Sequence, residues 1–199
     1  MTAEARQALV PTFPVLETER LHLREFTDED GPWYLEQFSR PETIEGQGYA
    51  APADLAAAIE EMHHYGIDMF RAGNGIRWAI CLKDAAGLPS PTPCTPIGSV
   101  ILMDWMDEPI ARAELGYSLN PAYWGHGYAS EAIAAAQRYG FEVMRLQRIE
   151  ALVWERNERS MRVMERLGYA REELLRESFE DSTGFKRSEW RMVLAASPR

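Results

Sequence analysis

The sequence has 199 residues, with 21 basic and 31 acidic side chains and a formal net charge of −10. A strongly acidic chain lacks the basic face that nucleic-acid phosphates require, so a general nucleic-acid binder is excluded. Apolar residues make up 46% of the chain, which is enough for a sizeable core, and the length suits one domain better than two.

Lysine and cysteine are both scarce. Lys83 and Lys186 are the only lysines, which leaves few places for a phosphate-loop lysine or a Schiff base. Cys81 and Cys94 form no Cys-x-x-Cys pair or Cys/His cluster, so we expect no metal site and leave one disulfide open. No stretch approaches about 18 consecutive apolar residues, and the first ten residues lack a signal-peptide core. We therefore expect a soluble cytoplasmic protein that does not bind membranes.

Taken in chain order, the pattern predicts a loose N-terminal arm over residues 1–16, followed by a single domain over 17–199. Strands are expected at 20–26, 77–82, 96–103, 111–119, 148–154, 169–178 and 185–194. Helices are expected at about 27–38, 54–72, 131–143 and 157–167, and a proline-rich exposed loop at 88–96. In the second helix, we expect Leu55, Ile59, Met62, Ile67 and Phe70 on the buried side. Strands outnumber helices and several lack a crossover helix between them, which is typical of an α+β fold with a mixed, largely antiparallel sheet.

A glycine-rich turn precedes the third expected helix. Gly125 and Gly127 allow backbone N–H groups to approach a ligand closely, and the helix N-terminus adds partial positive charge at the same place. Together these features can hold a pyrophosphate without any lysine. The alternative is a tight turn with no ligand.

Two nucleotide-binding motifs fit this turn poorly. A Walker phosphate loop requires a lysine after its second glycine, and no lysine follows any glycine here. A dinucleotide fingerprint requires a third glycine where Ser130 stands and a turn that directly follows a strand, whereas residues 120–124 intervene. Glu150 does fall at the acidic position of that fingerprint, but it begins a strand instead of ending one.

Three motifs lie in chain order at residues 17–24, 124–129 and 157–169. Together they resemble motifs of the GNAT superfamily of N-acetyltransferases, in its ribosomal-protein N-terminal acetyltransferase (RimJ/RimL-like) branch. Trp124-Gly-His-Gly-Tyr-Ala129 resembles the family's acyl-CoA signature, although Trp124 replaces the usual leading Arg or Gln. Asn157-Glu-Arg-Ser160, followed by Leu167-Gly-Tyr169, resembles the branch's Asn-x-x-Ser segment. The opening Glu17-Thr-Glu-Arg-Leu-His-Leu-Arg24 looks like its first strand, and the similarity covers about residues 15–195.

This resemblance implies a GNAT-type sheet whose fourth and fifth strands, here 112–119 and 148–154, splay apart to admit acetyl-CoA. It places the cofactor against the backbone of Tyr117, Ser118 and Leu119. It places the pyrophosphate against the amides of His126, Gly127, Tyr128, Ala129 and Ser130, and it adds Asn157 to the cofactor site. Gly116 is either the bulge that causes the splaying or an ordinary weak point in a strand.

The implied reaction is direct attack of a primary amine on the thioester. An ammonium has no lone pair, so the reaction needs a base or a water path that removes a proton. Strand alternation places Glu114 on one face with Gly116 and Ser118, near the splay, which makes it the candidate base; the alternative is a solvated or ion-paired glutamate. The family position makes Ser160 the candidate acid toward the thiolate; alternatively, Ser160 only supports the helix cap at Asn157.

The resemblance leaves the acceptor open between a protein N-terminus and a small-molecule amine such as a drug or polyamine. A non-catalytic acyl-CoA-binding module is a further alternative. We expect the acceptor pocket to involve the second helix and the loops 40–52 and 179–186. An edge strand near 185–194 would allow a homodimer.

Overall fold

The computed structural model describes residues 2–84, 87 and 94–196. Its centre is one eight-stranded sheet with the strand order β1-β2-β3-β4-β5-β6-β8-β7. The strands are Leu16–Glu17 (β1), Leu21–Arg24 (β2), Ile76–Leu82 (β3), Gly98–Met106 (β4), Arg112–Leu119 (β5), Arg148–Trp154 (β6), Ala170–Glu180 (β7) and Lys186–Ala195 (β8). All neighbours pair antiparallel except β5 and β6, which run parallel. The predicted α+β fold with a mixed, mostly antiparallel sheet is therefore confirmed.

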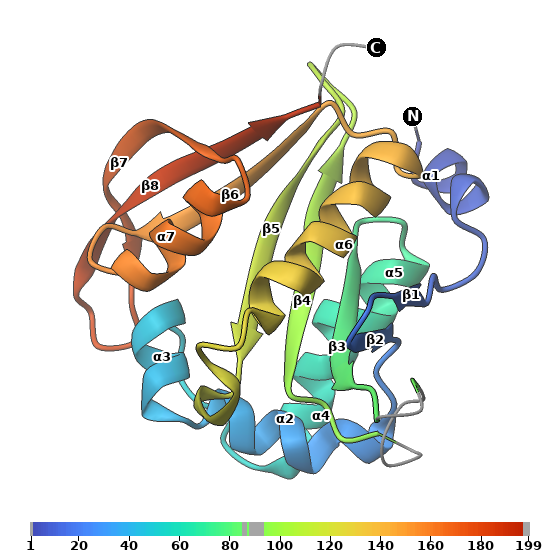
Figure 1. Cartoon of the computed structure of the whole chain (residues 1–199). Helices are drawn as coiled ribbons and strands as arrows, with labels where there is room; N and C mark the ends of the chain where they lie inside the picture. The colour runs from blue at the N-terminus through green and yellow to red at the C-terminus, as the bar shows by residue number, and fades with distance from the viewer. Residues whose placement is uncertain (1, 85–86, 88–93, 197–199) are drawn as a thin grey trace.

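Helices cover both faces of this sheet (Figure 1). They are Ala3–Leu9 (α1), Gly31–Phe38 (α2), Pro41–Gln47 (α3), Leu55–Met62 (α4), Met69–Arg71 (α5), Tyr128–Glu142 (α6) and Glu158–Arg166 (α7). A π-helical turn over His63–Asp68 joins α4 to α5, and short 3-10 turns over Asp28–Asp30 and Pro121–Tyr123 precede α2 and α6. In Figure 1, α6 lies in front of β4, and α7 lies in front of β6 and β8.

The core consists of two clusters on opposite faces of the sheet. Trp78 and Ile80 of β3 belong to the larger cluster, which includes α6, whereas Ala79 between them packs with α2 and α4. The sequence produces this division because successive strand residues point to opposite faces.

The same alternation orients the side chains of β5. Ala113, Leu115 and Leu119 lie in the larger cluster, on the α6 face. Glu114 and Ser118, at the intervening positions, therefore point to the face that carries α2 and α4. The predicted grouping of Glu114 with Ser118 on one face is confirmed.

The second predicted helix begins where its capping residue indicates. The Asp54 side chain accepts a hydrogen bond from Ala57 N at 2.9 Å, and the helical stretch continues through the π turn to Arg71. Met62 and Phe70 are buried as expected. The expectation for Leu55 was wrong, because this first residue after the cap is 42% exposed.

The N-terminal segment is not the loose arm that the sequence predicted. Residues 3–9 form α1, which is anchored through Arg6. Arg6 Nη1 lies 2.8 Å from Asp107 Oδ2, and Arg6 Nε donates to the Gly73 carbonyl at 2.8 Å. Val10 is buried in the core. These contacts are with residues far along the chain, and the local sequence pattern could not reveal them.

Two other expectations change. The expected loop over 40–52 contains α3, which Pro41 begins and the left-handed Gly48 ends. The strand near 185–194 is not an edge, because β8 lies between β6 and β7. The edge on that side is β7, so β8 cannot pair across a dimer as expected.

The strand irregularity beside the splay lies in β4 and not at Gly116. Gly116 pairs in regular register with Ile101, while the register of the β4–β5 pair shifts between Met103 and Met106. Asp104, within this shift, has a φ of 51°, the left-handed conformation often found at bulges. The bulge interpretation of Gly116 was therefore wrong.

A disulfide joins Cys81 to Cys94, the pairing that the sequence left open. Of the proline-rich loop expected over 88–96, residues 88–93 lie outside the described part of the chain. Within the described residues, no helix combines the length and apolarity needed to cross a membrane.

Candidate active site

The site is built on the fork where β5 and β6 part. Their parallel pairing joins residues 112–114 to residues 148–150, and each strand then continues alone, β5 to Leu119 and β6 to Trp154. Figure 1 shows the two strands diverging from their paired end. The splayed strands expected from the family resemblance are thus present, between 112–119 and 148–154.

Hydrogen-bond alternation shows which β5 backbone groups face the gap. Asn120 N donates to the Ile97 carbonyl on the β4 side, and the Ala111 carbonyl accepts from Gln147 N on the β6 side. Backbone groups at odd-numbered β5 positions therefore point toward β6, as those of Tyr117 and Leu119 do. Beyond the last β5–β6 pair, these groups face the gap and need another partner.

Two neighbouring contacts decide which β5 backbone groups remain free to bind a ligand in the gap. The Leu119 carbonyl accepts a hydrogen bond from Trp124 Nε1 at 2.8 Å, which leaves its N–H toward the gap. The backbone of Ser118 faces β4, where Ser118 pairs with Ser99, and the two hydroxyl oxygens lie 3.3 Å apart. Of the three predicted backbone contacts, Tyr117 and Leu119 therefore fit the gap better than Ser118.

The glycine turn lies at the N-terminus of α6, as expected. Gly125 and Gly127 have φ values of 82° and 81°, left-handed conformations that disfavour any side chain. Gly127 is the N-cap of α6, so the amides of its first turn have no helical acceptor. The predicted residues Tyr128, Ala129 and Ser130 form this turn, and His126 is exposed just before it.

Arg20 supports this turn, a role that the sequence did not predict. It donates to the His126 carbonyl at 2.9 Å, forms an ion pair with Glu131 at 2.6 Å, and lies 4.7 Å from the centre of the Tyr128 ring. The only sequence signal was an arginine at the start of the first strand, more than 100 residues away. Arg20 thus holds the glycine turn through the His126 carbonyl, and Glu131 neutralises the positive charge of Arg20.

Glu114 lies at the last paired position of the fork. Burial, together with the negative charges of Asp104, Glu189 and Glu150, raises its pKa to about 7. Within the described part of the chain, no ion pair joins Glu114 to a basic side chain, so the ion-paired alternative does not hold there. A carboxylate with this pKa is close to half protonated at neutral pH and can accept a proton.

Tyr117, Ser160 and Asn157 connect the two sides of the gap. The Tyr117 hydroxyl of β5 donates to Ser160 Oγ at 3.2 Å, and Ser160 N donates to Asn157 Oδ1 at 3.0 Å. Asn157 is therefore the N-cap of α7, which confirms the predicted helix cap. Because β5 side chains alternate, Tyr117 and Glu114 approach the fork from opposite faces of the sheet.

Replacing Asn157 by Ala should lower the free energy of unfolding by about 1 kcal/mol, the usual effect of losing an N-cap. Asn157→Asp keeps an acceptor oxygen and should retain the stability. Denaturant unfolding of the three proteins measures this difference. Equal stability for Asn157→Ala and the parent chain would contradict a capping role.

Two of the segments expected to form the acceptor pocket, residues 40–52 and 179–186, contact each other. The Gly48 carbonyl accepts from Ser182 N at 2.8 Å, and the rings of Tyr49 and Phe179 lie 5.2 Å apart. Tyr49 is 64% exposed, and its pKa is raised by partial burial and by the negative charges of Glu114, Tyr65 and Glu189. The segment after α3 and the 179–186 loop are therefore in contact, and the charge of Glu114 acts on Tyr49 at this contact.

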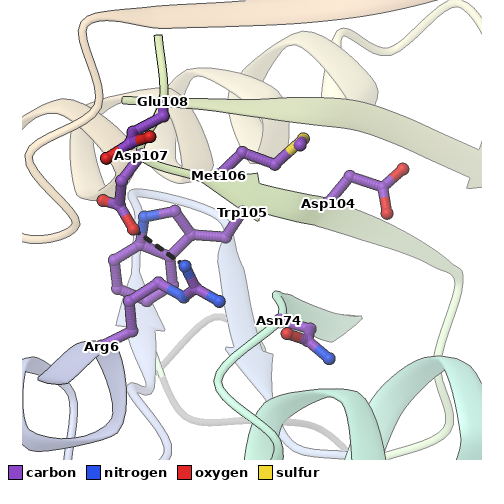
Figure 2. A pocket seen from close by; sticks show the side chains of 7 residues that line it. All are labelled: Arg6, Asn74, Asp104, Trp105, Met106, Asp107 and Glu108. Carbon is purple, nitrogen blue, oxygen red and sulfur yellow. Dashed lines mark hydrogen bonds and ion pairs between the residues drawn. The ribbon is translucent and has the colours of Figure 1, made fainter. Parts of the chain in front are cut away.

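A cavity of about 570 Å³ lies at the β4 bulge, and the sequence did not predict it. Figure 2 shows its seven lining residues, Arg6, Asn74, Asp104, Trp105, Met106, Asp107 and Glu108. Arg6 and Asp107 form the ion pair at one side, and Asp104 points away from them. Asp104 also raises the pKa of Glu114, so this acidic cavity belongs to the surroundings of the fork.

No group of three or more His, Cys, Asp or Glu side chains among the described residues is arranged to hold a metal ion. The β5 backbone beyond the fork and the amides at the start of α6 are the groups at this site that can hydrogen-bond an extended, amide-rich ligand.

Comparison with known proteins identifies the family to which the chain belongs. A family profile described as "Acetyltransferase (GNAT) domain" matches residues 20–170. The chain is 34% identical over 165 residues to the uncharacterized N-acetyltransferase YoaA of Bacillus subtilis, covering 83% of this chain and 88% of that one. The chain belongs to the GNAT family and is an N-acetyltransferase, so the resemblance to the GNAT superfamily is confirmed.

Solved structures share the fold. A ribosomal-protein-S5-alanine acetyltransferase from Vibrio fischeri superposes with a TM-score of 0.77 at 18% identity, covering 92% of this chain and 96% of that one. A spermidine N-acetyltransferase from Vibrio cholerae, solved with CoA and spermine, superposes with a TM-score of 0.73 at 20% identity, covering 89% and 96%. Enzymes of both acceptor types have this fold, so the fold alone does not identify the acceptor.

Proposed function

We propose that the protein transfers the acetyl group of acetyl-CoA to a primary amine by direct attack, with Glu114 as the general base. The observation that carries this proposal is the position of Glu114 at the closed end of the fork, with a pKa raised to about 7. A base with a pKa near the working pH combines a useful unprotonated fraction with adequate basicity.

The groups at the fork fit acetyl-CoA. The backbone of Tyr117 and Leu119 beyond the last β5–β6 pair can bond the amides of the pantetheine arm. The amides of residues 126–130 at the start of α6 can bond the pyrophosphate, where the helix dipole also favours an anion. Bound there, acetyl-CoA supplies an activated acyl group whose thiolate can leave.

In this arrangement the amine is deprotonated on one face of the sheet, and the leaving sulfur is protonated on the other. The amine approaches from the α2 and α4 face, where Glu114 removes a proton from the ammonium and so frees the lone pair with which nitrogen attacks. Ser160, across the gap on α7, gives a proton to the departing sulfur. Asn157 contributes by capping α7 and so fixing Ser160.

For the acceptor, we propose an amine in a positively charged molecule, either a protein N-terminus beside basic residues or a polyamine. Asp104 and Glu189 place negative charge around Glu114, which attracts cations to this face. The spermidine N-acetyltransferase of the same fold, solved with CoA and spermine, supports the polyamine alternative. The ribosomal-protein acetyltransferase supports the N-terminal alternative in the same way.

The test incubates the protein and acetyl-CoA with peptides bearing free N-termini, with polyamines and with aminoglycosides. CoA release and the mass of the acetylated product are measured for each acceptor. Release that depends on one amine class, and that falls in Glu114→Gln and Ser160→Ala, supports the proposal. Binding of acetyl-CoA without transfer to any amine overturns it and favours the acyl-CoA-binding module.

A further inference from the structure

We propose that Tyr117 supplies, through Ser160, the proton that the departing thiolate takes up. This inference rests on the proposed function, because it assigns the acid side of the same reaction. The family resemblance assigns only the backbone of Tyr117 to the cofactor and leaves its side chain without a role.

The geometry places the two hydroxyls in series. Tyr117 lies on β5 beyond the last pair with β6, and Ser160 lies in the first turn of α7, with 3.2 Å between their oxygens. The Asn157 cap fixes the backbone of Ser160, whose side chain is buried. Little water can therefore compete for the contact between the two hydroxyls.

The direction of this hydrogen bond follows from acidity. A phenol, with a pKa of about 10, is a far stronger donor than an aliphatic hydroxyl, so Tyr117 donates and Ser160 accepts. A serine hydroxyl has only one proton, and that proton must then point away from Tyr117. In the proposed relay it points into the gap between β5 and β6.

Ser160 alone is a poor net acid for this step, because an alkoxide is far more basic than a thiolate. In the proposed sequence, nitrogen attacks the carbonyl carbon and the carbon–sulfur bond breaks. Sulfur takes the Ser160 proton while Ser160 Oγ takes the Tyr117 proton, and solvent then returns a proton to the phenolate. The ammonium loses one proton to Glu114 before attack and a second as the amide forms. Both protons pass to solvent, and one solvent proton returns to the phenolate, so one proton is released for each acetyl group transferred.

Nearby charges favour the transient phenolate. Burial raises the pKa of Tyr117, while the bond to Ser160 and the positive charges of Arg159 and Arg166 lower it. The resting residue is therefore a neutral phenol. The arginines stabilise the negative charge only while it forms.

The test is a double-mutant cycle in kcat for acetyl-CoA, using Tyr117→Phe, Ser160→Ala and the double variant. Each single variant should lose about tenfold, less than the 10²- to 10⁴-fold usual for acid–base catalysis, because a thiolate leaves readily even without a proton. The double variant should lose no more than either single one, since members of one relay act as a unit. The KM for acetyl-CoA should stay within about twofold.

The matched control is Tyr139→Phe, a tyrosine of α6 that packs edge-on against Trp78 and should keep full activity. Parent-like kcat in Tyr117→Phe overturns the inference and leaves the proposed function standing. Losses that multiply in the double variant also overturn it, because they indicate two independent roles. A parent protein that acetylates no amine overturns the proposed function and this inference together.

Discussion

Replacing Glu114 by Gln is expected to lower kcat/KM for acetyl transfer about 10²- to 10⁴-fold near neutral pH, the usual contribution of a positioned base. The amide keeps the size of the side chain and its place on β5 but cannot accept a proton. Binding of acetyl-CoA, measured by titration calorimetry, should stay unchanged, because the proposed cofactor contacts lie further along β5 and at the α6 turn. Weaker binding with intact turnover would contradict the assignment.

Stability measurements separate this loss from unfolding. The pKa of Glu114 is raised from 4.5 to about 7 in the folded protein, so the folded chain binds more protons than the unfolded chain between these values. Folding stability due to this group is therefore lost as pH rises through that window. Glu114→Gln has no such cost and should unfold at the same or a higher temperature than the parent chain above about pH 7.

Asp104→Asn should change the pKa of Glu114 without removing its carboxylate. Asp104 is the first of the negative charges that raise the pKa of Glu114, although burial is the larger cause. Removing that charge should move the rise of activity with pH to lower pH without abolishing it. An unchanged profile would mean that Asp104 does not act on the catalytic base.

Replacing Gly127 by Val is the second substitution with a large expected effect. At a φ of +81° an L residue costs about 1–2 kcal/mol, and a β-branched residue costs more. The strain is one of conformation, since a Cβ there would meet only Arg20 Nη2, at 3.5 Å. Relaxing it rotates the peptide planes of the turn, so the KM for acetyl-CoA should rise about tenfold or more with little change in kcat.

Gly184→Val is the matched control for this change. Gly184 has a φ of +82° and no atom within 4 Å of an added Cβ, and it lies in the β7–β8 turn, away from the α6 turn. Both variants should lose similar stability in denaturant unfolding. Because Gly184 lies in the 179–186 loop expected at the acceptor pocket, the KM for acetyl-CoA is measured at saturating acceptor, and only Gly127→Val should raise it. Equal KM values would show that the α6 turn does not hold the cofactor.

The sequence predicted the parts of the fold that depend on local pattern. Strand alternation, the Asp54 and Asn157 caps and the glycine turn all depend on residues close together in the chain. Their elements accordingly appear where expected. The splay itself came from the family resemblance, since no local pattern shows that two parallel strands separate after three pairs.

The missed features all depend on long-range contacts. The α1 segment is fixed by Arg6 through Gly73 and Asp107, and the glycine turn is braced by Arg20. The interior position of β8 and the bulge at Asp104 likewise depend on which strands become neighbours. In the site, strand alternation indicated Glu114 and the family position indicated Ser160, but the contact between Tyr117 and Ser160 could be found only in the folded chain.

The pH dependence of kcat/KM for acetyl transfer, compared between the parent chain and Glu114→Gln, tests the central claim most directly. Titration of the acceptor amine affects both proteins equally, so a difference between the two profiles belongs to Glu114. The parent chain should show a rise with a midpoint near 7, set by the pKa of Glu114, and the variant should lack it. The same rise in both proteins would contradict Glu114 as the base.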